Sequence, residues 1–363
     1  MTDADDILLA AENCGVDLWA GVVGQADAVA QVRAASRNPV HAYLLVGPHG
    51  SGKRALARAF AAALLAQGRA TDEVARHVAL ALSETHPDLT IVEREGASIT
   101  AKQADAIVAS SMRSPMEGGP KILVLDEFHL VGSAAPKLLK SIEEPPAGTI
   151  FIVLADDVTP ELVTIASRCV RIDLGTVPVE AVSDRLIAEG IDPERAVVAA
   201  ASAGGDLGRA RLLATDDRLA LRQQAWRSVP DHLDGSGSAA MEQVDSLLAM
   251  IEDAMAPLAA AQAAEADELA EVIKARGERG SGRKQLEEKH KRQSRRHHTD
   301  EIRFGLGELS RRYRDDLLTS DRPQPLIDAI TAIAALAVEL VRNPNERLQL
   351  AALFVELGRL RST

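Results

Sequence analysis

The chain has 363 residues, a formal net charge of −12, 46% hydrophobic residues and only 2% aromatic residues. This length allows two or three domains with buried cores, which with so few aromatic rings must consist mainly of Ala, Leu, Val and Ile. The acidic charge argues against a surface that binds nucleic acid over its whole extent, so any such contact is expected to be local or shared with partners.

The sequence predicts a cytoplasmic protein. It has no run of eighteen apolar residues, and its first residues are rich in Asp rather than forming a basic leader before an apolar stretch. Cys14 and Cys169 are far apart and no CxxC pair occurs, which excludes a thiolate zinc site and disfavours a disulfide. No metal site is therefore expected.

The region from about 20 to 175 alternates short apolar runs with helical patterns, after a short amphipathic lead at 1–20. Strands are predicted at Ala42–Val46, Leu89–Val92, Lys121–Leu125, Thr149–Leu154 and Val170–Ile172, with helices such as Lys53–Ala66 and Ala101–Met112 between them. Short strands that are nearly all apolar are typical of a parallel sheet covered by helices on both faces. An α/β domain is therefore predicted.

The rest of the chain has a helical pattern. Three short helices are predicted at about 178–189, 193–203 and 209–215. Later breaks are expected at 234–238, 277–282 and 321–325. We expect three domains: an α/β domain over 1–175, a small helical domain over 176–218 and an all-helical domain over 219–363.

A phosphate-binding loop is predicted at Gly47-Pro-His-Gly-Ser-Gly-Lys53, between the first strand and the helix that begins at Lys53. Gly47, Gly50 and Gly52 let backbone N–H groups surround a phosphate, and the lysine neutralises it. In a working P-loop the next residue is a Ser or Thr that binds Mg²⁺. Here it is Arg54, which cannot ligate a cation, so the loop is expected to hold a phosphate without supporting hydrolysis.

Two carboxylates, Asp126 and Glu127, follow the strand Lys121–Leu125. In a working NTPase the Asp holds Mg²⁺ and the Glu polarises the attacking water. The alternative is an acidic pair that merely ends a strand. The P-loop favours NTPase ancestry, whereas Arg54 argues against present activity.

Two arginines are candidates for phosphate contacts. Arg168 lies at a predicted helix–strand junction, as either a surface ion-pair residue or an arginine finger for a phosphate held by a neighbouring subunit. Arg209 lies in the first turn of a helix that Asp206 is expected to cap. A cation is disfavoured there by the helix dipole, which suggests contact with a phosphate. His86 and His129 have no metal-ligand spacing and are expected to be ordinary polar side chains.

The stretch 274–298 holds ten Lys and Arg against three Glu. It is interpreted either as a solvated helix face with a flexible interruption or as a local contact for nucleic acid or a partner.

Taken in order, these motifs resemble the clamp-loader clade of the AAA+ ATPases, and most of all the delta-prime branch of the bacterial DNA polymerase III clamp-loader subunits. The resemblance covers about residues 20–215. It rests on Val23-Gly-Gln25, His41-Ala-Tyr-Leu-Leu-Val-Gly-Pro48, His86-Pro-Asp-Leu89, Leu125-Asp-Glu-Phe-His129, Leu138-Leu-Lys-Ser-Ile-Glu-Glu-Pro-Pro146 and Thr164-Ile-Ala-Ser-Arg-Cys169.

The resemblance implies an AAA+ P-loop domain, a helical lid and an all-α collar in the three predicted ranges. It also implies gamma/tau and delta partners in a hetero-pentamer, which contacts the sliding clamp and primed DNA. Arg168 would enter the ATP site of a neighbouring gamma/tau subunit. The chain would be a subunit of a DNA polymerase holoenzyme. A solitary nucleotide-binding regulator is disfavoured, because a finger without a neighbour has no purpose.

Two positions favour a non-hydrolysing delta-prime type over an active gamma/tau-like ATPase, which stays open as the alternative. One is Arg54, and the other is Ala155-Asp-Asp157, where active members have a Thr or Asn that senses the γ-phosphate. Weak ATP or ADP binding is possible. The residues implied for it are Gly47, Gly50, Gly52, Lys53, Arg54, Asp126, Glu127 and Arg209. Many members carry a four-cysteine zinc module, but residues 67–85 contain no cysteine, so no zinc is expected.

Overall fold

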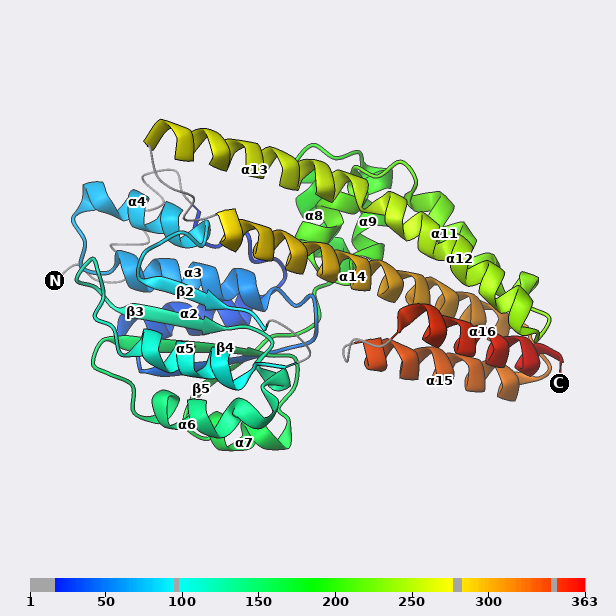
Figure 1. Cartoon of the computed structure of the whole chain (residues 1–363), viewed down its shortest axis with the longest axis horizontal. Helices are drawn as coiled ribbons and strands as arrows, with labels where there is room; N and C mark the ends of the chain where they lie inside the picture. Colours follow the sequence, from blue (N-terminus) through cyan, green and yellow to red (C-terminus); the bar gives the residue numbers. More distant parts are fainter. Residues whose placement is uncertain (1–16, 95–97, 277–282, 341–344, 363) are drawn as a thin grey trace. The chain divides into compact units, whose positions relative to one another are not determined.

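Figure 1 shows a computed structural model of the chain, which describes residues 17–94, 98–276, 283–340 and 345–362. The chain divides into two compact units, residues 1–214 and 215–363. The first contains a sheet and three following short helices, and the second is all-helical in its described residues. Most of the predicted N-terminal lead and the break at 277–282 lie outside the described residues.

A five-stranded sheet with the order β2-β3-β4-β1-β5 forms the centre of the first unit. Its strands are β1 (Ala42–Val46), β2 (Leu89–Val92), β3 (Lys121–Leu125), β4 (Thr149–Ala155) and β5 (Val170–Asp173). All neighbouring strands are parallel, which confirms the predicted sheet. Three strands have the predicted bounds, while β4 and β5 are each one residue longer.

Helices cover both faces of this sheet (Figure 1). Alternate β1 side chains point to opposite faces, so Tyr43 and Leu45 lie in one core cluster and Leu44 and Val46 in the other. The first face carries α2 (Ala26–Arg37), α3 (Lys53–Ala66) and α4 (Thr71–Leu82). The second carries α5 (Ala101–Ser111), α6 (Ala135–Glu143) and α7 (Pro160–Ala166), with the 3-10 helices η1 (Phe128–Leu130) and η2 (Gly132–Ala134).

Three short helices follow β5 within the first unit. They are α8 (Val179–Ala188), α9 (Pro193–Ser202) and α10 (Leu207–Ala214), and they pack against one another. The side chain of Asp192 caps α9, which has Pro193 in its first turn. Asp206 Oδ1 accepts a hydrogen bond from the backbone N–H of Arg209 at 2.9 Å, which confirms the predicted cap of α10.

The second unit is a helical bundle. Its helices are α11 (Leu219–Ser228), η3 (Val229–His232), α12 (Gly237–Ala254), α13 (Ala256–Arg276), α14 (Arg283–Leu317), α15 (Pro323–Glu339) and α16 (Glu346–Ser362). One apolar cluster forms its core and includes Trp226 and Phe354, whose rings meet edge to face. The buried guanidinium of Arg222 pairs with Asp216 and Glu301, so its positive charge is compensated within this unit.

Among the described residues, the segment Gly237–Glu271 is long and apolar enough, by length and composition, to cross a membrane. Its first half, α12, nevertheless directs Ala240, Val244, Leu247 and Ile251 into the core of the second unit. This spacing is that of an amphipathic core helix. The segment is therefore weak evidence for a membrane span.

Candidate nucleotide-binding site

The predicted phosphate loop lies between β1 and α3, at the carboxyl ends of the strands, where open α/β sheets bind ligands. Gly50 has φ 77° and Gly52 has φ 83°, left-handed conformations that favour glycine. Asp126 follows β3 and Asp156 follows β4. Since β3, β4 and β1 are adjacent strands, the fold gathers these distant residues at one edge of the sheet.

Lys53 is engaged by its own loop and by a carboxylate. Its Nζ donates hydrogen bonds to the carbonyl oxygens of Gly47 at 2.6 Å and Pro48 at 2.9 Å, and lies 2.8 Å from Asp156 Oδ1. Burial opposes ionisation of Asp156, but the hydrogen bond and charge of Lys53 hold the pKa of this carboxyl below its usual value. A phosphate entering the loop must therefore compete with Asp156, a residue whose pairing was not predicted.

Arg54 lies among three carboxylates. Its Nε and Nη2 donate to the two oxygens of Glu84 at 2.9 and 2.6 Å, and its Nη1 donates to Glu93. The same Nη1 is 3.4 Å from Asp126 Oδ2. Burial disfavours the charged guanidinium, but the hydrogen bond to Glu84 and the charges of the carboxylates outweigh it and raise the pKa of Arg54. The guanidinium thus occupies the space between position 54 and Asp126, where an active P-loop enzyme binds Mg²⁺.

Two glutamates at this edge have left-handed backbones. Glu84 has φ 61° and Glu127 has φ 49°, and in the described parts of the chain they are the only non-glycine residues with positive φ. Each of these glutamates pairs with an arginine: Glu127 Oε2 lies 2.7 Å from Arg94 Nε, and Glu84 pairs with Arg54. Such conformations cost on the order of 1–3 kcal/mol each and cluster at functional or switch sites. Glu127, the predicted water-polarising residue, is therefore held in an ion pair.

The short helices after β5 approach the phosphate loop. A Cβ atom added to Gly50 would lie 2.2 Å from the carbonyl oxygen of Gly204, and one added to Gly205 would lie 2.9 Å from the carbonyl oxygen of Gly50. Only glycine permits this close approach of two backbones. Arg209, which is largely buried, lies in the first turn of the helix that follows. The structure thus brings the segment that carries Arg209 to the loop.

Arg168 lies at a different place. It precedes β5, whose Val170 is beside Tyr43, whereas the phosphate loop follows the other end of β1. Its Nε is 2.7 Å from Glu143 Oε1, its Nη1 donates to the Thr164 carbonyl oxygen at 2.9 Å, and its side chain is 44% exposed. Arg168 therefore lies at the opposite edge of the sheet from the loop of its own chain and forms a surface ion pair.

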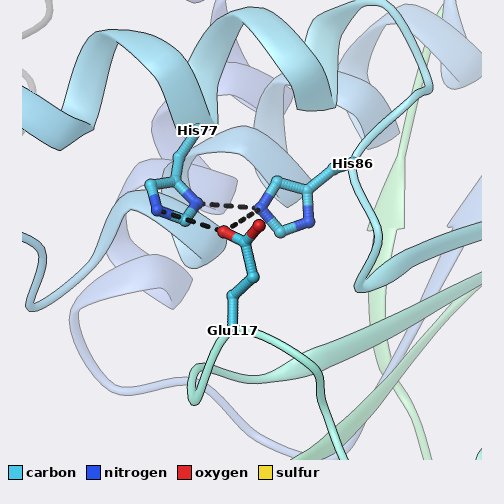
Figure 2. Close-up of side chains that lie close together, drawn as sticks. All are labelled: His77, His86 and Glu117. Carbon is cyan, nitrogen blue, oxygen red and sulfur yellow. Dashed lines mark hydrogen bonds and ion pairs between the residues drawn. The ribbon is translucent and has the colours of Figure 1, made fainter. Parts of the chain in front are cut away.

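Figure 2 shows a cluster of two histidines and a glutamate that was not predicted. His77 on α4, His86 before β2 and Glu117 before β3 bring their ligand-type atoms together in a largely buried group. His77 Nδ1 is 2.8 Å from His86 Nε2, and Glu117 Oε2 is 3.5 Å from His77 Nε2. Sequence spacing gave no signal for this group, because its members belong to three separate segments. Two imidazoles and a carboxylate are a possible zinc ligand set.

The hydrogen bonds of this cluster assign its protons and argue against a metal. The backbone N–H of Asp88 donates to His86 Nδ1 at 3.0 Å, so the ring proton of neutral His86 is on Nε2 and is donated to His77 Nδ1. His77 then carries its proton on Nε2, facing Glu117. Arg76 donates to both oxygens of Glu117 at 2.9 and 2.8 Å. This chain of hydrogen bonds leaves neither imidazole a lone pair for a metal.

The histidine pair predicts a dependence of stability on pH. Burial lowers the pKa of both His77 and His86. Their stabilisation is thus fully present above the unfolded pKa, about 6.5, and is lost as the pH falls through the lower folded values. We expect His77→Gln to have a melting temperature that falls less than that of the wild type on acidification below about pH 6.5, followed by calorimetry. Equal pH dependence of the two proteins would contradict this.

The fold agrees with the architecture predicted from the sequence. It has a parallel sheet with a phosphate loop after β1, an acidic pair after β3, three short helices after β5 and a following all-α unit. The predicted fold class is confirmed.

Comparison with known proteins shows which proteins the first unit resembles in sequence. Residues 25–178 match the family model for the DNA polymerase III delta subunit. DNA polymerase III subunit delta' of Pseudomonas aeruginosa is 38% identical over 137 residues, which are 36% of this chain and 42% of that protein. Subunit delta' of Bacillus subtilis is 32% identical over 41% of this chain and 46% of that protein. Subunit tau of B. subtilis is 30% identical over 40% of this chain and 26% of that protein.

A solved structure of a DNA polymerase III gamma subunit-related protein from Thermotoga maritima aligns with 92% of this chain and 99% of its own. Its TM-score is 0.43 at 15% identity, so the relationship rests on the sequence matches. These confirm the resemblance to bacterial DNA polymerase III clamp-loader subunits, of both delta' and tau/gamma type, within the first unit. The chain spans less than half the length of these curated relatives.

Proposed function

We propose that the chain is a delta-prime-type subunit of a DNA polymerase III clamp loader and does not itself hydrolyse ATP. The observation that carries this proposal is the position of Arg54. Its guanidinium lies between position 54 and Asp126, and it pairs with Glu84 and Glu93 as well. Phosphoryl transfer in P-loop enzymes needs a metal ion that bridges the β- and γ-phosphates. This chain supplies neither the hydroxyl ligand nor the space for that ion.

Nucleotide binding, if retained, would be weak and largely independent of Mg²⁺. The backbone of the loop and Lys53 would hold the phosphates of ATP or ADP, and Arg209 would approach from the lid. Lys53 must first exchange Asp156 for a phosphate. Calorimetric titration with ADP can check this, and an affinity that rises steeply when Mg²⁺ is added would contradict it. No zinc is proposed.

Arg168 is proposed to act in trans on the ATP site of a neighbouring gamma/tau subunit. Its exposed side chain and its place away from its own phosphate loop support this role. The ion pair with Glu143 lies at the surface, where such pairs contribute only about 0–1 kcal/mol. Exchanging Glu143 for a phosphate would therefore cost little. Arginine presents a fork of donors that matches phosphate oxygens.

The proposed partners are gamma/tau and delta subunits in a hetero-pentamer, which would contact the sliding clamp and primed DNA in the cytoplasm. The second unit would contribute the collar that joins the subunits. The basic stretch 274–298 lies partly outside the described residues, and we assign it no separate role.

An active gamma/tau-like ATPase is the second candidate. It is favoured by the matches to tau subunits and by the retained Lys53, Asp126 and Glu127. Comparing the ATPase rates of the purified chain, of gamma/tau with delta, and of the mixture separates the two candidates.

We expect the chain alone to hydrolyse ATP at the background rate and to raise the ATPase rate of its partners on mixing. The reason is that Arg54 fills its own metal position, whereas Arg168 is exposed to a neighbour. A turnover of about one per second by the chain alone, within the ordinary range for enzymes, would favour the second candidate if Lys53→Ala abolished it.

A further inference from the structure

Three carboxylates from separate segments converge near the beginning of α3. Glu84 follows α4, Glu93 follows β2 and Asp126 follows β3. Their side chains are 24%, 26% and 12% exposed, so they are partly withdrawn from water. Like charges that are close together and partly buried repel one another strongly unless a cation lies between them. This arrangement therefore requires a counter-ion.

The counter-ion in this structure is Arg54, which pairs with all three carboxylates. The contact with Glu84 is the most specific, because both oxygens of the carboxylate accept from the guanidinium in a bidentate pair. Glu84 adopts a left-handed backbone conformation, φ 61°, at the turn after α4. Arg58 lies one turn further along α3 and is 3.7 Å from Glu84, so it contributes a second, weaker positive charge.

We propose that the guanidinium of Arg54 takes the place of a divalent cation in a site formed by three carboxylates, those of Glu84, Glu93 and Asp126. Without Arg54 this site would bind a divalent cation. Glu84 is the residue that positions the Arg54 guanidinium. Mg²⁺ and Mn²⁺ take carboxylate and hydroxyl oxygens as ligands. A hydroxyl at position 54 would add a further oxygen beside Asp126. The three ion pairs of Arg54 would explain why the nucleotide site of the proposed function holds no metal ion.

The test is the variant Arg54→Thr, studied in the full chain by calorimetric titration with Mn²⁺ and by thermal unfolding. We expect Arg54→Thr to bind one Mn²⁺ ion that the wild type does not bind. In EDTA its melting temperature should be about 5 °C lower, because a partly buried pair is broken. Millimolar Mn²⁺ or Mg²⁺ should restore most of this loss while leaving the wild type unchanged.

Two variants serve as matched controls. Arg54→Thr combined with Asp126→Asn removes one oxygen ligand charge and should lose the extra Mn²⁺ site. Arg58→Thr removes an arginine from the same helix while Arg54 still fills the cluster, and it should gain no Mn²⁺ site. The proposal is overturned if Arg54→Thr binds no more Mn²⁺ than the double variant.

Arg54→Lys keeps the test decisive if the threonine variant does not fold. Lysine retains a positive charge near the carboxylates, so this variant should fold and bind no additional Mn²⁺. A gain of Mn²⁺ binding by Arg54→Lys would overturn the proposal, because a charged side chain would then not exclude the metal. These readouts are independent of ATP, so they can fail while the proposed clamp-loader role holds, and the reverse is also possible.

Discussion

Replacing Arg168 with Ala is expected to slow the DNA-stimulated ATPase and the clamp loading of an assembled complex, with assembly itself unchanged. An arginine finger contributes on the order of 10³–10⁵ in rate at the site that it completes. The loss in the whole complex should be smaller, because only one of several ATP sites would face this subunit. The measurements are ATP turnover and clamp loading by complexes reconstituted with the variant.

Two further variants make this result specific. Arg168→Lys should restore little activity, because an ammonium group cannot reproduce the two-pronged donation of a guanidinium. Arg171→Ala removes another exposed arginine three residues away, one that pairs with Asp173 on β5, and it should leave the rate unchanged. If Arg168→Ala assembled normally and kept wild-type rates, Arg168 would be only the surface partner of Glu143.

Replacing Gly305 with Ala is expected to destabilise the second unit by about 3 kcal/mol, the upper part of the usual range for overpacking a core. A Cβ atom at this position in α14 would lie 1.9 Å from Cε2 of Trp226. That indole is buried and packs against Phe354, so it has little room to move. Denaturant unfolding followed by circular dichroism would measure the loss.

Gly307 in the same helix provides the matched control, because no neighbouring atom lies within 4 Å of a Cβ added there. Gly307→Ala should stabilise the helix by about 1 kcal/mol through the higher helix propensity of alanine. A Gly305→Ala variant as stable as Gly307→Ala would show that the contact with Trp226 does not limit this position.

The sheet and its phosphate loop could be predicted because their signals are local. A run of apolar residues such as Ala42–Val46 predicts a strand by itself, and the glycines after β1 form their loop within seven residues. The loss of a metal ligand at Arg54 was also visible in the sequence. What replaces the metal could not be predicted, because Glu84 reaches Arg54 only through the packing of α4 against α3.

The sequence did carry a signal for two of the carboxylates that pair with Lys53 and Arg54. Glu93 and Asp156 each directly follow a strand, and the carboxyl ends of parallel strands meet at one edge of the sheet. They could therefore have been placed near the loop before their partners were known. His77 and Glu117 had no such signal, since one is on a helix and the other in a bend before β3.

The close approach of Gly50 to Gly204 and Gly205 has a mechanical meaning. Where nucleotide bridges a lid and its core, exchange of ATP for ADP changes the joint between them. Here two stretches of main chain are in direct contact, so the connection between the short helices and the sheet does not depend on a bound nucleotide. The short helices after β5 and the sheet of the first unit would then move together as one rigid body, and the angle between them would not change with nucleotide exchange.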